Sequence, residues 1–317
     1  MNHFISVKDV ASVSALIESG RTLKADPFNN QQVGQGKTIG LLFMNPSLRT
    51  RISTQVAAKN LGMDVIVFNA DKDGWQLEFG DGVVMNGNTT EHVKEAAAVL
   101  GQYVDILGVR SFPGLTDREK DYSEYIMKSF MRYSGVPVVS LESATLHPLQ
   151  SLADLITITE HLPSNRTPKV VLTWAPHVKA LPQAVPNSFA EWVNAWGASD
   201  FWITQPKGYE LDASFTQGAT ITHSQDEALE GADFVYVKNW SSYTDYGKIL
   251  NSDPSWMMTA KKLERTNQAK VMHCLPVRRN VVIADEVLDS PSSIVIQEAG
   301  NRVWAAQAVL AELLKNC

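Results

Sequence analysis

Residues 38–51 read Thr-Ile-Gly-Leu-Leu-Phe-Met-Asn-Pro-Ser-Leu-Arg-Thr-Arg, and the chain is organised around this stretch. The apolar run at 38–43 predicts a buried strand, and residues 47–61 have the spacing of a helix, with Ser47 as its N-cap. A helix N-terminus that follows a strand attracts anions, because its unpaired N–H groups and its dipole favour negative charge. Arg49 and Arg51 add donors that match phosphate oxygens. The alternative is that both arginines pair with surface carboxylates.

Length and composition indicate an enzyme-sized protein of two domains. The chain has 317 residues, of which 44% are hydrophobic and 20% charged, and its net charge of −6 argues against bulk nucleic-acid binding. It has no apolar run of 18 residues, and its first residues lack a secretory pattern, so we expect no membrane span and a cytoplasmic location. Cys274 and Cys317 are the only cysteines, too few for a disulfide framework.

Strand and helix patterns alternate through the chain. Strands are predicted at 38–43, 64–68, 105–110, 136–141, 169–174, 200–204, 233–237 and 270–273, and helices at 7–22, 47–61, 90–100, 122–134, 147–158, 186–196, 225–229 and 298–314. This alternation predicts two doubly wound parallel-sheet α/β domains. We expect a first domain at 1–146, a second at 147–297, and a C-terminal helix at 298–317 that returns to the first. Residues 69–88 read as a long loop.

Two short patterns have alternative explanations. Gly-Gln-Gly-Lys-Thr at 34–38 ends like a nucleotide-binding P-loop, but Gln31 stands where the first glycine should be and the segment precedes a strand, so we expect a turn. Polar side chains follow several predicted strands, including Arg110, His147 with Gln150, and the segment 273–278. Ligands of open α/β sheets bind at the carboxyl ends of strands, so these residues are predicted to converge. A lone histidine at a helix start is more often a capping or core residue.

Taken in order, these motifs resemble the aspartate/ornithine transcarbamylase family over essentially the whole chain. Ser-x-Arg-Thr-Arg at 47–51 resembles that family's carbamoyl phosphate loop, and Arg110, His-Pro-Leu-Gln at 147–150, His-Cys-Leu-Pro at 273–276 and Arg302 follow it. The resemblance implies an active site in the cleft between two domains, carbamoyl phosphate as a substrate, and no cofactor or metal. The residues assigned to carbamoyl phosphate are Ser47, Leu48, Arg49, Thr50, Trp75, Arg110, His147, Gln150, Cys274, Leu275 and Arg302.

The chemistry of these side chains agrees with that assignment. The residues expected to be catalytic are Arg49, Thr50, Arg110, His147, Gln150, Cys274 and Arg302. Arg110 and His147 suit polarisation of the carbamoyl C=O as negative charge builds on its oxygen. Gln150 offers a donor and an acceptor to the carbamoyl amide. Trp75 resembles a residue that a neighbouring subunit donates to the site, which implies a homotrimer with shared sites; the alternative is an aromatic side chain that packs its own loop.

The second substrate is predicted from a branch of the same family. The Ser-Met-Gly motif of ordinary ornithine transcarbamylases is absent, and the chain instead resembles N-acylornithine transcarbamylases at Trp75, Glu142, Trp174-Ala-Pro-His177, Lys238-Asn-Trp240 and 273–279. The residues assigned to the acylornithine are Thr90, Glu142, His177, Lys179, Lys238, Cys274, Leu275 and Arg278. Lys238 and Arg278 suit carboxylate and acyl oxygens, and Glu142 suits a hydrogen bond near the substrate amide.

Thr90 bears on the acyl group. Its position resembles one that is Glu in acetyl-specific members of this branch and Pro in succinyl-specific members. A neutral Thr leaves room for a succinyl carboxylate, which a Glu would repel. The alternative role of Thr90 is N-capping of the next helix. Lys179 adds positive charge. We therefore predict transfer from carbamoyl phosphate to the side-chain amine of N-succinyl-L-ornithine, giving N-succinyl-L-citrulline and phosphate, in arginine biosynthesis. N-acetyl-L-ornithine, then free ornithine, then a catalytically silent metabolite-binding relative are the alternatives.

Overall fold

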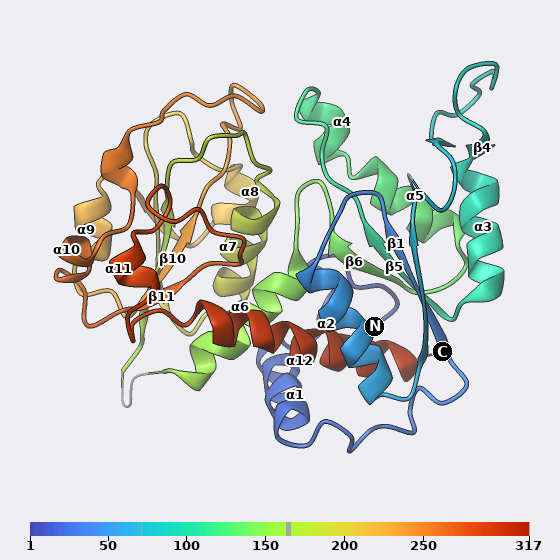
Figure 1. Ribbon diagram of the computed structural model, residues 1–317, viewed down its shortest axis with the longest axis horizontal. Helices are drawn as coiled ribbons and strands as arrows, with labels where there is room; N and C mark the ends of the chain where they lie inside the picture. The colour runs from blue at the N-terminus through green and yellow to red at the C-terminus, as the bar shows by residue number, and fades with distance from the viewer. Residues whose placement is uncertain (71, 163–165, 317) are drawn as a thin grey trace. The chain divides into compact units, whose positions relative to one another are not determined.

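The computed structural model describes residues 1–70, 72–162 and 166–316, which form two compact units (Figure 1). The first unit comprises Met1–Gly114, Glu119–Leu149 and Arg302–Cys317, and the second comprises Leu115–Arg118 and Gln150–Asn301. The chain changes unit at 149/150 and at 301/302, next to the predicted boundaries at 146/147 and 297/298. The short segment Leu115–Arg118 belongs to the second unit, which the sequence did not indicate.

The first unit is built on a four-stranded parallel sheet in the order β2-β1-β5-β6. Its strands are β1 (Thr38–Phe43), β2 (Asp64–Asn69), β5 (Ile106–Arg110) and β6 (Val138–Glu142), and β3 (Leu77–Glu78) pairs with β4 (Glu91–His92) outside it. Its helices are η1 (Val7–Asp9), α1 (Val13–Ala25), α2 (Arg49–Asn60), α3 (Val93–Tyr103) and α5 (Tyr125–Tyr133); α4 (Arg118–Tyr122) begins at the last residue of the segment Leu115–Arg118.

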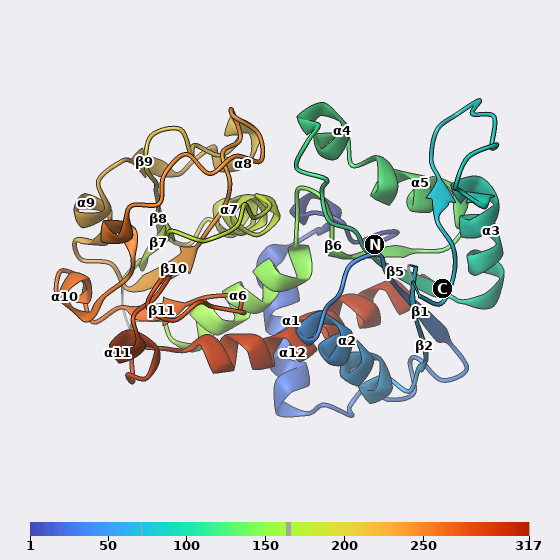
Figure 2. The ribbon, with the colours of Figure 1, turned by 45° about the horizontal axis from the view of Figure 1, so that its top comes forward.

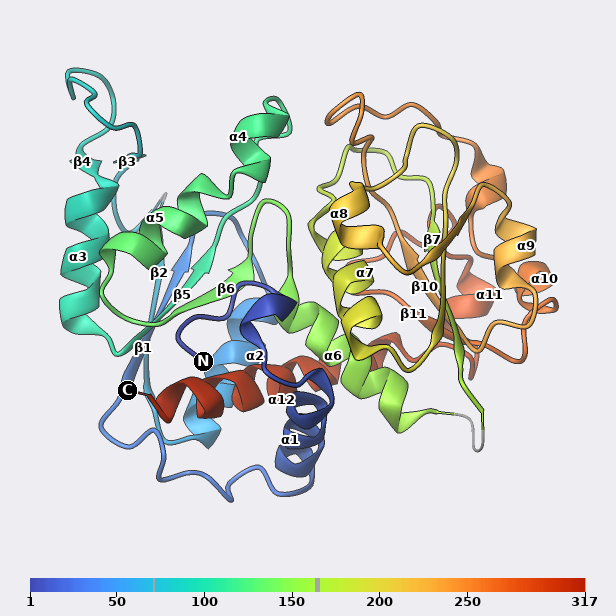
Figure 3. The ribbon, with the colours of Figure 1, turned by 180° about the vertical axis from the view of Figure 1, so that it is seen from behind.

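Helices cover both faces of this sheet, as the doubly wound prediction requires. On one face α3 and α5 pack against the strands through buried residues such as Val93, Ala97 and Phe130 (Figure 3). On the other face α1, α2 and the end of α12 gather, and Asn60 of α2 donates to Gln307 of α12 at 3.0 Å. The strands β1, β5 and β6 are almost entirely buried, which explains their continuous apolar sequences, whereas the edge strand β2 is partly exposed.

The second unit contains a five-stranded parallel sheet in the order β11-β10-β7-β8-β9. Its strands are β7 (Lys169–Trp174), β8 (Asp200–Thr204), β9 (Thr220–Thr222), β10 (Phe234–Lys238) and β11 (Lys270–Met272). Its helices are α7 (Ala184–Trp196), α8 (Ala213–Thr216), α9 (Gln225–Leu229), η2 (Pro254–Trp256), α10 (Ala260–Leu263) and α11 (Asp285–Leu288). Side chains alternate along β10, so Val235 joins Leu229 of α9 in one core cluster while the ring of Tyr236 stacks on Phe189 of α7.

Each sheet has one point where the strand order reverses. In the first unit the chain runs from β1 outward to β2 and then returns to β5 on the other side of β1, so the reversal lies between β1 and β5. In the second unit it lies between β7 and β10. In open α/β sheets, ligands bind outside the carboxyl ends of the strands at such a point. The two reversals therefore indicate where each unit binds its ligand.

Two helices carry the chain across the unit boundary: α6 (Pro148–Glu160) and α12 (Val295–Leu314) (Figure 2). Residues 147 and 150, which flank the start of α6, therefore belong to different units. Among the described residues, no helix combines the length and the apolar character that a membrane crossing would need. The predicted turn at 34–38 is confirmed, because the chain turns at Gly36, with φ +75°, directly before β1.

The structure corrects three predictions about helix ends. The helix predicted at 7–22 is interrupted, because Val10 is extended after η1 and Ser12 caps a new helix by accepting from the N–H of Ala15. Ser47 is not the N-cap of α2: Leu48 takes that place with a helical backbone, and no side chain caps the helix. Thr90 is not an N-cap either, because the Nδ1 of His92 accepts from the N–H of Lys94 at the start of α3.

Candidate active site

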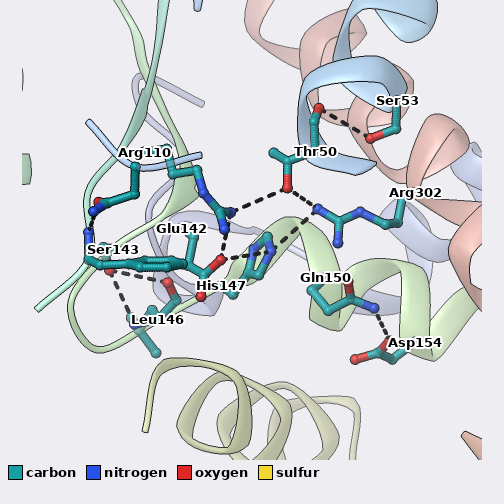
Figure 4. A network of polar contacts seen from close by, with 12 residues as sticks. Thr50, Ser53, Arg110, Glu142, Ser143, Leu146, His147, Gln150, Asp154 and Arg302 are labelled. Atoms are coloured by element: carbon teal, nitrogen blue, oxygen red, sulfur yellow. Dashed lines mark hydrogen bonds and ion pairs between the residues drawn. The ribbon is translucent and has the colours of Figure 1, made fainter. Parts of the chain in front are cut away.

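The hydroxyl of Thr50 lies between two guanidinium groups in the first unit (Figure 4). Thr50 Oγ1 accepts a hydrogen bond from Nη1 of Arg110 at 3.4 Å and a second from Nη2 of Arg302. Thr50 is in the first turn of α2, Arg110 ends β5, and Arg302 lies on α12. Arg110 is 60 residues from Thr50 in the sequence and Arg302 is 252 residues from it, yet all three meet beside the strand-order reversal. The structure brings together three of the residues predicted to bind carbamoyl phosphate.

Glu142 neutralises one of these cations. Its Oε2 lies 2.6 Å from Nη1 of Arg110, and both side chains are 9% exposed. The sheet sets up this contact, because Glu142 ends β6 and is the register partner of Arg110 at a β-bulge. A buried ion pair of this kind holds both side chains in place, and removal of either partner would leave an uncompensated charge. Glu142, which we assigned to the acylornithine, therefore lies in the first unit with the carbamoyl phosphate residues.

His147 completes this group as a neutral side chain. Burial, followed by the charges of Arg302 and Arg110, holds the pKa of His147 well below its usual value. The 3.6 Å approach of its Nε2 to Glu142 is therefore not an ion pair. Nε2 of His147 lies 3.4 Å from Nη2 of Arg302, from which a neutral ring can accept a hydrogen bond. A neutral imidazole keeps one N–H donor without adding a third positive charge.

Two buried nitrogen atoms of this group have no hydrogen-bond partner among the described residues. They are Nε of Arg110 and Nδ1 of His147. Most buried polar atoms in proteins are paired, and an exception at a cluster of charged side chains is typical of a site that a ligand completes. The cluster of Thr50, Arg110, Glu142, His147 and Arg302, which we call the arginine cluster, has the donors that a phosphorylated ligand requires.

The start of α2 supports the same conclusion. No side chain caps this 12-residue helix, so its first N–H groups and its dipole remain available to an anion. Arg49 and the exposed Leu48 stand at this end. Arg51, by contrast, donates to Oδ1 of Asn69 at 3.0 Å and lies over the ring of Phe43, so it holds the ends of β1 and β2 together. Of the two arginines in the motif, Arg51 is therefore structural.

Gln150 belongs to the second unit, and its amide is oriented by two carboxylates. Its Nε2 donates to Oδ1 of Asp154 at 2.7 Å and to Oε1 of Glu298 at 3.3 Å. All three side chains are fully buried. The amide NH₂ of Gln150 is thus held by two acidic side chains. The predicted contact of Gln150 with the carbamoyl amide stays a prediction.

Residues 273–275, which follow β11, are also in the second unit. The N–H of His273 donates to Oε2 of Glu298 at 2.8 Å, and the N–H of Leu275 donates to Nδ1 of His273 at 2.8 Å. Leu275 has φ 54°, a left-handed conformation that costs a non-glycine residue about 1–3 kcal/mol and is concentrated at functional sites. Cys274 is buried, and burial together with the nearby Asp154 and Cys274 raises the pKa of Tyr236 well above its usual value.

Four of the residues predicted to bind the acylornithine form a second cluster. His177 follows β7 and Lys238 ends β10, on either side of the strand-order reversal of the second unit. Burial first, and then the charges of Lys238, Arg278 and Lys179, lower the pKa of His177, so these cations lie near it. Lys238 is 8% exposed, and its Nζ donates to the carbonyl oxygen of Asn239 at 3.1 Å. We call His177, Lys179, Lys238 and Arg278 the lysine cluster.

The lysine cluster lacks counter-charges in the described part of the chain. No Asp or Glu oxygen of those residues lies within 4.0 Å of Lys179, Lys238 or Arg278. A buried ammonium group without a carboxylate partner is energetically costly unless a ligand supplies one. This cluster is therefore suited to a ligand that carries carboxylates.

Trp75 and Thr90 lie together on the loop of the first unit between β2 and α3. Trp75 is 54% exposed and donates from Nε1 to Glu91 at 2.8 Å, while the N–H of Thr90 donates to the carbonyl of Gln76 at 3.1 Å. In the part of the chain that the structure describes, the hydrogen bonds of Trp75 and Thr90 stay within this region and do not reach the arginine cluster. Both interpretations of Trp75, a contribution to a neighbouring subunit's site and packing of its own loop, stay predictions.

Sequence reasoning missed Glu298 and Asp154. Asp154 follows Gln150 by four residues on a predicted helix, a spacing that places both on one face, so this signal was available. Glu298 precedes Arg302 by four residues in the predicted C-terminal helix, but nothing local indicated that its side chain would reach residues 150 and 273. Among the described residues, no group of three or more His, Cys, Asp or Glu side chains is placed to hold a metal ion.

Comparisons with known proteins identify the family. The family model for the aspartate/ornithine carbamoyltransferase carbamoyl-P binding domain matches residues 2–160, and the model for the Asp/Orn binding domain matches residues 183–313. The chain is 51% identical to an N-succinylornithine carbamoyltransferase of Bacteroides fragilis over 318 residues, covering 100% of this chain and 99% of the relative. It is 37% identical to an N-acetylornithine carbamoyltransferase of Xanthomonas campestris over 335 residues, covering 99% and 98%.

A solved structure gives the same result for the fold. A glutamate-to-alanine variant of N-acetyl-L-ornithine transcarbamylase, complexed with carbamyl phosphate and N-succinyl-L-norvaline, matches with a TM-score of 0.89 and 36% identity. The match covers 99% of this chain and 100% of that one. The prediction of two parallel-sheet domains flanked by helices is confirmed. This chain belongs to the aspartate/ornithine carbamoyltransferase family.

Proposed function

We propose that this protein transfers the carbamoyl group of carbamoyl phosphate to the side-chain amine of N-succinyl-L-ornithine, forming N-succinyl-L-citrulline and phosphate in arginine biosynthesis in the cytoplasm. The uncharged amine attacks the carbamoyl carbon, the C–O bond to phosphate breaks, and the amine releases a proton. The observation that carries the proposal is that the two units hold chemically different cation clusters: the first unit has one beside an uncapped helix start, and the second has one around the buried Lys238.

The arginine cluster and the start of α2 would bind carbamoyl phosphate. The N–H groups of the first turn of α2, Ser47, Arg49 and the hydroxyl of Thr50 suit the phosphate oxygens. Arg110 and the neutral His147 would donate to the carbamoyl oxygen as it gains negative charge, a role in which a buried donor is worth about 10²–10³ in rate. The carbonyl oxygen of Gln150, with residues 274–275, would accept from the carbamoyl NH₂. No part of this scheme uses a cofactor.

The lysine cluster would bind the acylornithine. N-succinyl-L-ornithine carries an α-carboxylate and a succinyl carboxylate, whereas N-acetyl-L-ornithine carries only the first. Buried Lys238 and the exposed Lys179 and Arg278 lie near His177, and three cations there suit a ligand with two carboxylates better than a ligand with one. The relative that is 51% identical is an N-succinylornithine carbamoyltransferase, and the one that is 37% identical acts on N-acetylornithine by name, which supports the same order of preference.

The test is an assay of carbamoyl transfer to N-succinylornithine, N-acetylornithine and ornithine side by side, with both phosphate and the carbamoylated product measured. We expect the succinyl compound to be used at least about 10-fold more efficiently than the acetyl compound, since one desolvated charge pair contributes more than about 1.4 kcal/mol. Higher activity with the acetyl compound would assign the protein to the alternative. No transfer to any of the three amines would indicate a silent relative.

We further propose a homotrimer in which the loop between β2 and α3 contributes Trp75 and Thr90 to the site of a neighbouring subunit. This loop exposes Trp75, Val83, Val84 and Met85. A second apolar stripe runs along α2, where Leu48, Ile52 and Val56 are exposed at four-residue spacing. Two different apolar patches on one chain suit a heterologous interface, which closes into a ring.

Subunit mixing tests the shared site. Trp75→Ala subunits mixed with Arg49→Ala subunits should regain activity, because some sites in a mixed trimer combine an intact loop from one subunit with an intact α2 start from another. The mass of the assembly should be that of three chains. If mixed trimers form and show no recovery, each subunit uses its own Trp75 and the proposal fails.

A further inference from the structure

Glu298 contacts both the start of α6 and the end of β11, the two segments of the second unit that we assign to carbamoyl phosphate. Its Oε1 lies 3.3 Å from Nε2 of Gln150 in the first turn of α6, and its Oε2 lies 2.8 Å from the backbone nitrogen of His273 at the end of β11. These segments are separated by more than a hundred residues of sequence. Glu298 is 0% exposed and is held near the N-terminal end of the 20-residue helix α12.

The two contacts require both oxygens of a carboxylate. Each oxygen accepts one N–H, and a carboxylate is the side-chain group that offers two equivalent acceptors in a fixed plane. The geometry therefore fixes the distance between the Gln150 amide and the backbone turn at residues 273–275.

Asp154 acts on the same amide from the other side. Its Oδ1 lies 2.7 Å from Nε2 of Gln150, so the two amide hydrogens are divided between Asp154 and Glu298. An amide held at both hydrogens has one allowed orientation, with its carbonyl oxygen directed away from the two carboxylates. A rotated amide would direct a donor at the ligand and would set its oxygen against two acceptors.

We propose that Glu298 is a positioning residue for carbamoyl transfer: it sets the Gln150 carbonyl and the 273–275 backbone at the spacing that holds the NH₂ of the carbamoyl group. It does so without touching substrate. The proposal rests on the proposed function, because it assigns the carbamoyl NH₂ to these two segments. A displacement of about 1 Å at such groups costs roughly 100-fold in rate even when the side chains that touch substrate are intact.

Glu298→Gln is the test variant, since it keeps shape and removes one acceptor. The glutamine amide keeps one of the two contacts and places a donor against a donor at the other. We expect kcat to fall about 10–100-fold and KM for carbamoyl phosphate to rise. Inhibition by inorganic phosphate should be unchanged, because phosphate uses the arginine cluster and the start of α2. Glu298→Asp, which keeps two acceptor oxygens on a shorter side chain, should recover part of the loss.

Glu160→Gln is the matched control. Glu160 also lies on α6, and it accepts from Asn301 of α12 at 2.9 Å, so the same chemical change is made between the same two helices away from Gln150. It should leave kcat and KM within about twofold. The thermal unfolding midpoint of each variant is also measured. It shows that both variants are folded at the assay temperature, so that a difference in kcat does not come from unfolding.

The double variant Glu298→Gln with Gln150→Ala tests the route of the effect. If Glu298 acts through Gln150, the double variant should be less impaired than the product of the two single losses. The inference is overturned if Glu298→Gln behaves like Glu160→Gln, or if it weakens phosphate inhibition and substrate binding equally. A wild-type enzyme without carbamoyl transfer would instead overturn the proposed function, so the two failures are distinguishable.

Discussion

Arg110 and Lys238 occupy corresponding places in the two units but are neutralised differently. Each ends a strand beside the strand-order reversal of its sheet, and as whole residues they are 7% and 8% exposed. Arg110 pairs with Glu142 at 2.6 Å, whereas Nζ of Lys238 has the carbonyl of Asn239 at 3.1 Å and, among the described residues, no carboxylate within 4.0 Å. Arg110 is thus charge-compensated before any ligand binds. Lys238 depends on its ligand for a negative charge.

This difference suggests a division of labour between the units. Preorganised donors around Thr50 suit the reacting group, because they need no rearrangement when negative charge develops. Uncompensated cations suit recognition, because they favour ligands that carry carboxylates and disfavour those without them. On this basis we expect variants of the arginine cluster to affect the chemical step and variants of the lysine cluster to affect acceptor binding.

Arg110→Ala should have the largest effect. It removes a donor to the developing oxyanion, so we expect kcat/KM to fall at least about 10³-fold with a loss in kcat as well as in KM. It also leaves the buried carboxylate of Glu142 unpaired, which costs about 3–5 kcal/mol of stability. Steady-state kinetics and urea unfolding measure the two effects.

Adding Glu142→Gln to Arg110→Ala separates these effects. The double variant should regain stability, because no unpaired charge remains, and it should stay inactive. If Arg110→Ala retains the wild-type kcat, Arg110 has no part in the chemical step. The claim that the arginine cluster stabilises the reacting group would then be contradicted.

Lys238→Met should have the next largest effect, confined to the acceptor. The substitution keeps the length of the side chain and removes the charge that we assign to a substrate carboxylate. We expect KM for the acylornithine to rise about 10–100-fold while KM for carbamoyl phosphate stays within twofold. Stability should not fall, since a buried charge is replaced by an apolar group. An unchanged acceptor KM would contradict the role of Lys238.

Thr90→Glu should change acceptor preference. A carboxylate at this position would repel the terminal carboxylate of a succinyl group, so the ratio of kcat/KM for the succinyl compound to that for the acetyl compound should fall about 10-fold. Thr90→Gln is the control, because it has nearly the same size as glutamate without the charge. If both variants have the wild-type ratio, Thr90 does not contact the acyl group.

The smallest expected effect is a change in the pH dependence of stability. Burial lowers the pKa of His147 in the folded state, so between that pKa and the unfolded value near 6.5 the unfolded chain binds more protons. This contribution is therefore fully present above about pH 6.5 and is lost as pH falls, by at most about 1.4 kcal/mol per pH unit. Urea midpoints of His147→Gln should fall less between pH 7 and 5 than those of the wild type; equal slopes would contradict a buried neutral histidine.

Much of the fold could be predicted from residue patterns. The strands Thr38–Phe43, Lys169–Trp174 and Asp200–Thr204 have the predicted bounds, because strands of a parallel sheet buried on both faces give continuous apolar runs. The strand Thr220–Thr222 was missed: it is a short edge strand with exposed residues, so its sequence lacks that signal. Helix starts were misplaced at Ser47 and Thr90, because a good capping residue does not act as a cap unless the backbone turns there.

The site was predictable where motifs contact the ligand directly and not where a residue acts through another. Arg110, His147 and Arg302 were expected from the motifs, and the structure brings them together. Whether they bind carbamoyl phosphate stays a prediction, as do the assignments of the lysine cluster. Glu298 and the pairing of Glu142 with Arg110 depend on contacts between segments far apart in sequence, which no local pattern records.

The most direct test of the division between the units is a calorimetric titration of freshly dissolved carbamoyl phosphate into three proteins: wild type, Arg110→Ala and Lys238→Met. No acceptor is present, so only the first binding site is examined. Our account predicts that Lys238→Met binds carbamoyl phosphate like the wild type and that Arg110→Ala binds it at least about 10-fold more weakly. The reverse pattern, with Lys238→Met impaired and Arg110→Ala unaffected, would contradict the account.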